Sequence, residues 1–139
     1  MIKDGATIID VGGESTRPNA SPVSEQEEID RVIKVVEAIN RSFGEQVWVS
    51  VDTSSPTVMT LASQVGAKIW NDVRALTRPD AIAPAAKLDI PVMLMHMRGE
   101  PTTMNQLDDY QDLYTDVISE LQQRIDKVVA GGGLSLLHI

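Results

Sequence analysis

The sequence has no cysteine and is poor in aromatic side chains, long apolar runs and clustered basic residues. The absence of cysteine excludes disulfides, thiolate metal sites and a cysteine nucleophile. No apolar stretch approaches the roughly 20 residues that cross a bilayer, so no membrane span is predicted. The net charge is −8 and Lys or Arg never occur in a run, so we expect no nucleic-acid or membrane partner, because both are bound through basic patches. Lys3 and Asp4 break the pattern of a secretory signal, and we expect a cytoplasmic protein.

Several motifs of catalysis and cofactor binding are missing too. There is no G-x-G-x-x-G, P-loop or G-x-S-x-G sequence, and two histidines do not suggest a metal site. What remains is an ordinary globular composition, with 42% hydrophobic and 23% charged residues. The 139 residues suit one domain but fall short of a complete (β/α)₈ barrel, which takes about 250 residues.

Short apolar runs alternate with amphipathic segments along the whole chain. Ser24 with Glu27 forms a capping box, Ser55 before Pro56 marks a second helix start, and Pro84 is expected to disturb a third helix. The runs predict strands at 6–11, 47–51, 68–70 and 91–95, and the 3.6-residue periodicity predicts helices at 25–43, 56–65, 80–87 and 108–130. This alternation predicts an α/β fold with a parallel sheet.

Each predicted strand is apolar until its carboxyl end, where a polar side chain appears. The four are Asp10, Asp52, Asn71 and His96. Parallel α/β folds bind ligands beyond this end of their strands. Alternation of side chains places Asp10, Asp52 and Asn71 on one common face with Met95, whereas His96 points the other way or lies in the loop. Carboxylates with an amide suit a heterocycle with an amino-pyrimidinone edge. The alternative interpretation is that these are loop residues and helix caps.

A long loop follows the first strand, beginning at Gly12 and Gly13. The glycines allow close backbone approach. Thr16 offers a hydroxyl, and Arg17 offers a fork-shaped cation that suits phosphate or carboxylate. The alternative is a solvent-exposed loop with a surface arginine.

Four blocks of the chain resemble dihydropteroate synthase, the bacterial enzyme of folate biosynthesis. They are residues 4–18, 49–53, 69–72 and 92–97, the last followed by 101–104, and they occur in the family's order and spacing. The resemblance covers about residues 1–130. It implies a (β/α)₈ TIM barrel, here an incomplete one of about four parallel strands with alternating helices. Residues 1–130 would form a partial pterin-binding barrel domain, and residues 131–139 a divergent tail, Gly-rich and apolar, in which 134–139 could form a strand.

The resemblance implies a transferase. The family condenses 4-aminobenzoate with 6-hydroxymethyl-7,8-dihydropterin diphosphate to give dihydropteroate and pyrophosphate, and it is the target of sulfonamides. By motif, Asp52 and Asn71 would hydrogen-bond the pterin ring, Met95 would pack against it, and Asp10 would support them. Asp52 would also be catalytic, because a carboxylate beside the ring stabilises the cation that develops as pyrophosphate leaves.

The resemblance assigns the long loop as well. Thr16, Arg17 and Pro18 would close over the diphosphate and the aminobenzoate. Mg²⁺ would assist the leaving group, with its protein ligand outside this chain and no metal ligand within it. A homodimer is implied for the full-length family.

The family also uses residues that this chain does not contain, on an earlier strand and on three later ones. We therefore expect little or no synthase activity from the chain alone, and weak stability because half a barrel leaves one sheet face uncovered. Two alternatives stay open. One is the pterin-binding domain of a methyltetrahydrofolate:corrinoid methyltransferase, and the other is a non-catalytic truncated fragment.

Overall fold

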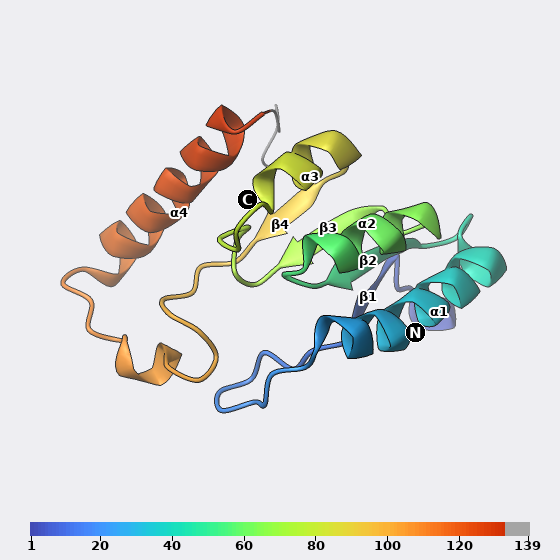
Figure 1. Cartoon of the computed structure of the whole chain (residues 1–139), viewed down its shortest axis with the longest axis horizontal. Helices are drawn as coiled ribbons and strands as arrows, with labels where there is room; N and C mark the ends of the chain where they lie inside the picture. Colours follow the sequence, from blue (N-terminus) through green and yellow to red (C-terminus); the bar gives the residue numbers. More distant parts are fainter. Residues whose placement is uncertain (133–139) are drawn as a thin grey trace.

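The computed structural model describes residues 1–132, in which strands and helices alternate along the chain (Figure 1). In order they are β1 (Ile8–Gly12), α1 (Glu25–Phe43), β2 (Trp48–Asp52), α2 (Pro56–Gln64), β3 (Ile69–Asp72), α3 (Ile82–Leu88), β4 (Val92–Leu94) and α4 (Leu113–Ala130). Short 3₁₀ turns lie at Ile2–Asp4 and Met104–Gln106. The predicted α/β alternation is confirmed.

The four strands form one parallel sheet in the order β1-β2-β3-β4. The register aligns Gly12 with Asp52, Asp52 with Asn71, and Asn71 with Met93. Neighbours in sequence are thus neighbours in the sheet, and each pair is joined through a segment that contains a helix. This is the arrangement of an incomplete (β/α)₈ barrel, as predicted.

Helices α1, α2 and α3 cover one face of the sheet (Figure 1). The strand residues on that side include Val49, Val51 and Trp70, which are 0–1% exposed. They pack with Val32 of α1 and Val58 of α2, both fully buried. The core therefore lies between the sheet and these helices, where the apolar stripe of each helix faces the pleat.

The opposite face of the sheet is largely open. Ile8, Trp48 and Met93 point there by strand alternation, and they are 46%, 51% and 42% exposed. In a closed barrel this face is the interior, which side chains fill. The apolar residues of this open face are therefore part of a barrel lining.

The ends of the helices follow their capping residues. Ser24 Oγ accepts a hydrogen bond from the Glu27 amide at the start of α1, which is one half of the predicted capping box, whereas the Glu27 carboxylate binds Arg31. The prediction that α4 starts near 108 is wrong, because Asp112 caps a helix that begins at Leu113. Pro84 does not disturb α3, because it is the third residue of Ile82–Leu88, where a missing amide costs no intrahelical bond.

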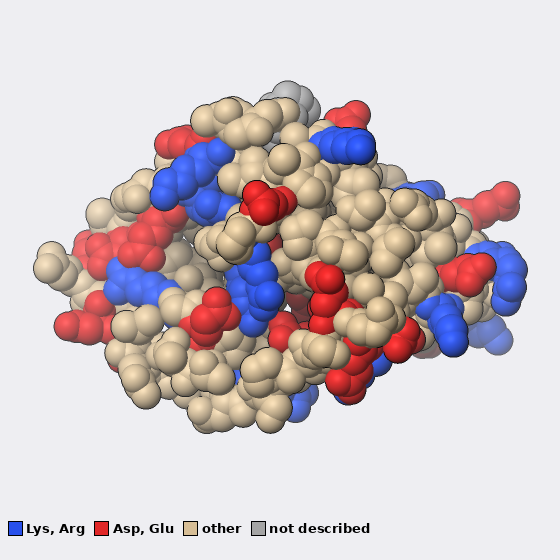
Figure 2. All heavy atoms as spheres, in the orientation of Figure 1, with Lys and Arg blue, Asp and Glu red and all other residues tan. Residues whose placement is uncertain are grey.

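Some predictions concern the surface and the tail. Acidic and basic side chains are interspersed on the face shown in Figure 2. Within residues 1–132, every helix is too short or too polar to cross a membrane. The strand predicted at 134–139 lies outside the described residues, and the division at 130–131 stays a prediction.

Candidate functional site

The carboxyl ends of β1, β2 and β3 bring together three of the predicted site residues. Asp52 and Asn71 are register partners on adjacent strands. Asn71 Nδ2 donates to Asp10 Oδ2 at 3.3 Å, across the strand that carries Asp52. Asp10 is exposed, and the other two are half-buried. The structure thus places two carboxylates and an amide in one group that opens to the uncovered side of the sheet.

The electrostatic setting of this group is strongly acidic. Burial, followed by the negative charges of Asp10 and Asp72, raises the pKa of Asp52 to about 6. Arg74 opposes this shift but does not cancel it. At neutral pH Asp52 is therefore mostly a carboxylate, and a ligand that donates hydrogen bonds or carries positive charge would relieve the repulsion.

Ser50 lies beneath this group, as the register partner of Asp10. Its side chain is fully buried, and within residues 1–132 its Oγ has no hydrogen-bond partner. Buried hydroxyls are normally satisfied, so this one is an exception, and its complete burial keeps it from direct contact with a ligand at the strand ends. Ser50 is not among the residues that the sequence singles out.

Asp72 follows Asn71 but points to the helix side, where it is fully buried. It accepts hydrogen bonds from Ser54 Oγ at 2.6 Å and from the amides of Arg74 at 2.9 Å and Leu76 at 2.7 Å. These bonds hold the turn after β3, in which Ala75 and Leu76 have φ of 51° and 56°. Such left-handed conformations cost free energy in residues with a Cβ, so the turn depends on Asp72.

Gly13 positions the long loop against α1. A Cβ at Gly13 would lie 2.9 Å from both Glu28 Cγ and Val32 Cγ2 of α1. Glycine therefore permits the close approach of this loop to the helix, as the paired glycines predict. Glu28 is itself buried, with Oε1 unpartnered within residues 1–132, and burial is the main cause that raises its pKa.

The loop residues are not brought to the strand ends. Thr16 is half-buried, and Arg17 and Pro18 are exposed. Within residues 1–132 no hydrogen bond or ion pair joins the Arg17 side chain to Asp10, Asp52 or Asn71. The loop instead contacts the β4–α4 connection, where the Asn19 amide donates to the Pro101 carbonyl at 3.1 Å. The assignment of Thr16, Arg17 and Pro18 to the substrate stays a prediction.

Met95 and His96 lie beyond the end of β4. Met95 is 45% exposed and lines a hollow of about 120 Å³ with Ala75, His96 and Arg124. His96 Nε2 lies 2.8 Å from Glu120 Oε2 of α4. His96 thus lies in the loop after β4, which is one of the two predicted alternatives, and its side chain pairs with a residue of α4. The role of Met95 against a pterin ring stays a prediction.

Arg74 is a residue that the sequence analysis missed. Its side chain is 6% exposed, and it lies 3.1 Å from Glu14 and 2.6 Å from Glu100. Burial opposes its charge, but Glu100 and Glu14 outweigh that effect and the pKa of Arg74 is raised. No spacing in the sequence marks this arginine, because its partners are 60 and 26 positions away.

A metal site does not form from the residues described. Within 1–132, no group of three His, Asp or Glu side chains is arranged to hold a metal ion. The described residues therefore do not by themselves form a site for Mg²⁺. Mg²⁺ stays a prediction of the resemblance.

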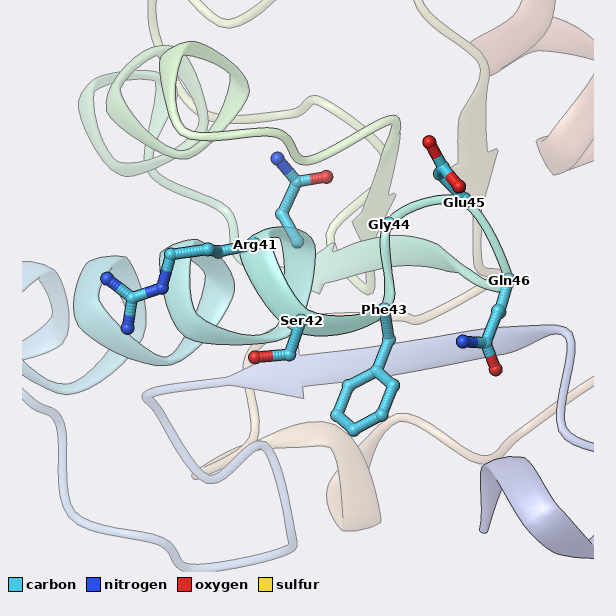
Figure 3. Close-up of a pocket in the computed structure, with 7 residues that line it drawn as sticks. Arg41, Ser42, Phe43, Gly44, Glu45 and Gln46 are labelled. Atoms are coloured by element: carbon cyan, nitrogen blue, oxygen red, sulfur yellow. The ribbon is translucent and has the colours of Figure 1, made fainter.

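A surface hollow of about 450 Å³ lies elsewhere, around the turn that joins α1 to β2 (Figure 3). This turn is at the amino end of β2, opposite the strand ends that carry Asp52 and Asn71. Figure 3 shows Arg41, Phe43 and Glu45 pointing in different directions. Binding sites have convergent polar groups, so we place the functional site at the strand ends rather than here.

Known proteins resemble this chain closely. The family model described as pterin binding enzyme matches residues 1–134. The dihydropteroate synthase of Haemophilus influenzae is 49% identical over 132 residues, which are 95% of this chain and 47% of that protein. A structure of Yersinia pestis dihydropteroate synthase in complex with a sulfonamide drug has 50% identity and a TM-score of 0.90, over 94% of this chain and 47% of that one.

A third relative is the Xanthomonas albilineans dihydropteroate synthase solved with 4-aminobenzoic acid. It is 40% identical with a TM-score of 0.82, over 94% of this chain and 45% of that one. The chain thus spans about half the length of the relatives it matches. The matched residues include the whole described sheet and its strand ends. The chain belongs to the family of pterin binding enzymes.

Proposed function

We propose that this chain forms the pterin-recognising half of a dihydropteroate synthase. The main support for this proposal is that Asp52 and Asn71 are adjacent at the ends of β2 and β3. Asn71 is also hydrogen-bonded to Asp10. The names of the compared relatives support the reaction, which condenses 4-aminobenzoate with 6-hydroxymethyl-7,8-dihydropterin diphosphate in folate biosynthesis. They also favour the synthase over the corrinoid methyltransferase.

The geometry supports recognition of a flat, amino-substituted heterocycle. An ionised Asp52 accepts hydrogen bonds only, so it matches ring N–H and amino groups of a pterin. Asn71 keeps its carbonyl oxygen as an acceptor while its Nδ2 is held by Asp10, which limits rotation of the amide. The pterin would thus meet side chains whose orientation is set before binding.

The Asp52 carboxylate would also lower the barrier of the reaction. The bond between the pterin methylene carbon and the diphosphate oxygen breaks, and its electron pair leaves with pyrophosphate. The positive charge left on the methylene and ring is stabilised by the Asp52 carboxylate. The nitrogen of 4-aminobenzoate then forms the new bond and loses a proton to solvent. Thr16, Arg17 and Pro18 would face the diphosphate and the aminobenzoate, where the Arg17 cation would offset negative charge.

Other features of the whole enzyme go beyond the described residues. Mg²⁺, a homodimer and a cytoplasmic location stay predictions. So does the expectation of little or no turnover from this chain alone, and with it the alternative of a non-catalytic fragment. Sulfonamide binding is proposed for the complete site, by analogy with the Yersinia pestis complex.

Pterin binding is the direct test. Calorimetric titration of the purified chain with the pterin diphosphate should give saturable binding. Asp52→Asn and Asn71→Ala should each weaken it by about tenfold or more, because each removes a hydrogen bond to the ring. Glu37→Gln, on an exposed position of α1, is the control and should bind as the parent does. A folded parent chain that does not bind the pterin would contradict the proposal.

A turnover assay separates recognition from catalysis. Coupling of 4-aminobenzoate to the pterin diphosphate by the purified chain is expected to be slight. Clear turnover that Asp52→Asn abolishes would strengthen the proposed function and overturn the expectation of an inactive fragment. Turnover that Asp52→Asn leaves unchanged would contradict the role given to Asp52.

A further inference from the structure

Arg74 is buried where three connections between strands and helices meet. Its Nε donates to Glu100 Oε2 at 2.6 Å, in the β4–α4 connection. Its Nη1 donates to Glu14 Oε2 at 3.1 Å, in the β1–α1 loop, and to Ser54 Oγ at 3.0 Å, between β2 and α2. One side chain therefore holds segments that are far apart in the sequence.

The β1–α1 loop and the β4–α4 connection also contact each other directly. The Asn19 amide donates to the Pro101 carbonyl at 3.1 Å, and Pro101 follows Glu100 directly and is buried. Between the two contacts lies a hollow of about 190 Å³, lined in part by Glu14, Ser21 and Glu100. The β1–α1 loop is thus fastened to the β4–α4 connection on both sides of Thr16, Arg17 and Pro18.

The network also reaches the strand ends. Ser54 Oγ, which accepts from Arg74, donates to Asp72 at 2.6 Å. Asp72 directly follows Asn71 at the end of β3. Hydrogen bonds to charged partners are stronger than neutral ones, and a buried arginine left without its carboxylates is costly. The loop, the β4–α4 connection and the end of β3 therefore share one charged residue.

We propose that Arg74 is a positioning residue that makes the β1–α1 loop and the β4–α4 connection order together. Its hydrogen bond to Glu14 fixes the chain just before the segment Thr16–Pro18. Its hydrogen bond to Glu100 makes the position of that segment depend on the β4–α4 connection. The role for the substrate rests on the proposed function, whereas the coupling between the loops does not.

Hydrogen exchange of the purified chain tests the coupling without any ligand. Glu100→Gln changes only the β4–α4 connection, yet the amides of residues 15–22 should exchange about tenfold faster, because a charge-assisted hydrogen bond is lost. The exchange of α2 should not change. If residues 15–22 exchange as in the parent chain while Glu100→Gln is folded, the proposal is overturned.

Substitutions at Arg74 itself have a matched control. Arg74→Met should accelerate exchange at 15–22 and at 98–104 together. Arg78→Met is the control, because Arg78 lines the same hollow, is exposed and makes no ion pair within residues 1–132. Arg74→Lys keeps the charge with fewer donors and should restore part of the protection. Equal exchange in the Met and Lys variants would argue for packing alone and contradict the proposal.

Further variants and the pterin titration allow the loop coupling and the proposed function to be judged separately. If Arg74→Met does not fold, Glu14→Gln and Glu100→Gln, separately and combined, replace it, and a coupled pair gives less than the product of the single effects. Pterin binding that fails in the parent chain contradicts the proposed function but leaves the loop coupling to be judged by exchange. Normal pterin binding, together with loops that exchange independently, would contradict the loop coupling and leave the proposed function standing.

Discussion

Asn71 Nδ2 donates to Asp10 Oδ2 at 3.3 Å, although the two residues are 61 positions apart. The bond spans from β3 to β1 over the strand that carries Asp52. It brings a second carboxylate close to Asp52, and that charge contributes to the raised pKa of Asp52. The fold therefore brings two carboxylates close together at this site, and the stability of the protein should depend on pH as a result.

Asp52 should make the chain less stable at neutral pH than in mild acid. Its pKa rises from 3.8 to about 6 on folding. The folded state thus binds the proton more tightly, and the resulting stabilisation is present below pH 3.8 and lost as pH rises through about 6. Asp52→Asn should raise the free energy of unfolding at pH 7.5 and make no difference near pH 4, as measured in urea. Asp108→Asn, at an exposed position, is the control. A benefit of Asp52→Asn that is the same at both values of pH would contradict the shift.

The two tryptophans should respond to the same substitution with very different losses of stability. Trp70 is 0% exposed, and its Nε1 donates to the Thr53 carbonyl at 2.7 Å. Trp70→Phe should cost about 2–4 kcal/mol, from the cavity and the unpaired carbonyl. Trp48, 51% exposed on the open face, should lose less than about 0.5 kcal/mol as Trp48→Phe. Urea unfolding of both variants checks this, and similar costs would mean that the open face is covered in solution.

Neighbouring glycines offer a third comparison. In Gly13→Ala the new Cβ would lie 2.9 Å from atoms of Glu28 and Val32, so we expect a loss of about 1–3 kcal/mol. In Gly12→Ala the closest atom, Asp52 Cβ, is 3.4 Å away, which is an ordinary contact. Gly12→Ala should therefore be nearly neutral for thermal stability. A greater loss at Gly12 than at Gly13 would show that the loop does not pack on α1 in this way.

Docking of α4 should depend on Glu120. Hydrogen bonds from Arg98, and then from His96, lower the pKa of Glu120 from 4.5 to about 2. The stabilisation from this carboxylate is present above pH 4.5 and is lost as pH falls through about 2. Glu120→Gln should speed amide exchange in α4 at pH 6 and leave α1 unchanged. Glu37→Gln is the control on an exposed helix face. Unchanged protection of α4 would show that apolar contacts such as Val128 suffice.

Much of the fold could be read from local patterns. The cap at Ser24 and the Ser55–Pro56 start determine where α1 and α2 begin, because those bonds lie within one turn. The start of α4 was misplaced for the same local reason, since any of several acidic residues before Leu113 could have served as its cap. Alternation along β2 also placed Asp52 correctly on the face opposite the core.

The site could be predicted only in part. Asp10, Asp52 and Asn71 were found because strand ends are visible in sequence and parallel strands meet at one edge. Arg74 and Asp72 were missed, because nothing in the spacing shows that Arg74 is buried between Glu14 and Glu100, or that Asp72 holds a left-handed turn. These contacts join residues from separate loops.

The sequence alone therefore determined the order of the elements, the parallel sheet, the family resemblance and the three residues at the strand ends. Each of these depends on periodicity, capping or short motifs, which act over a few neighbouring residues. The tertiary structure decided the raised pKa of Asp52, the pairing of His96 with Glu120, and the burial of Arg74 between its two carboxylates. Burial and charge act through space, and their strength depends on which distant residues the fold brings within a few ångströms.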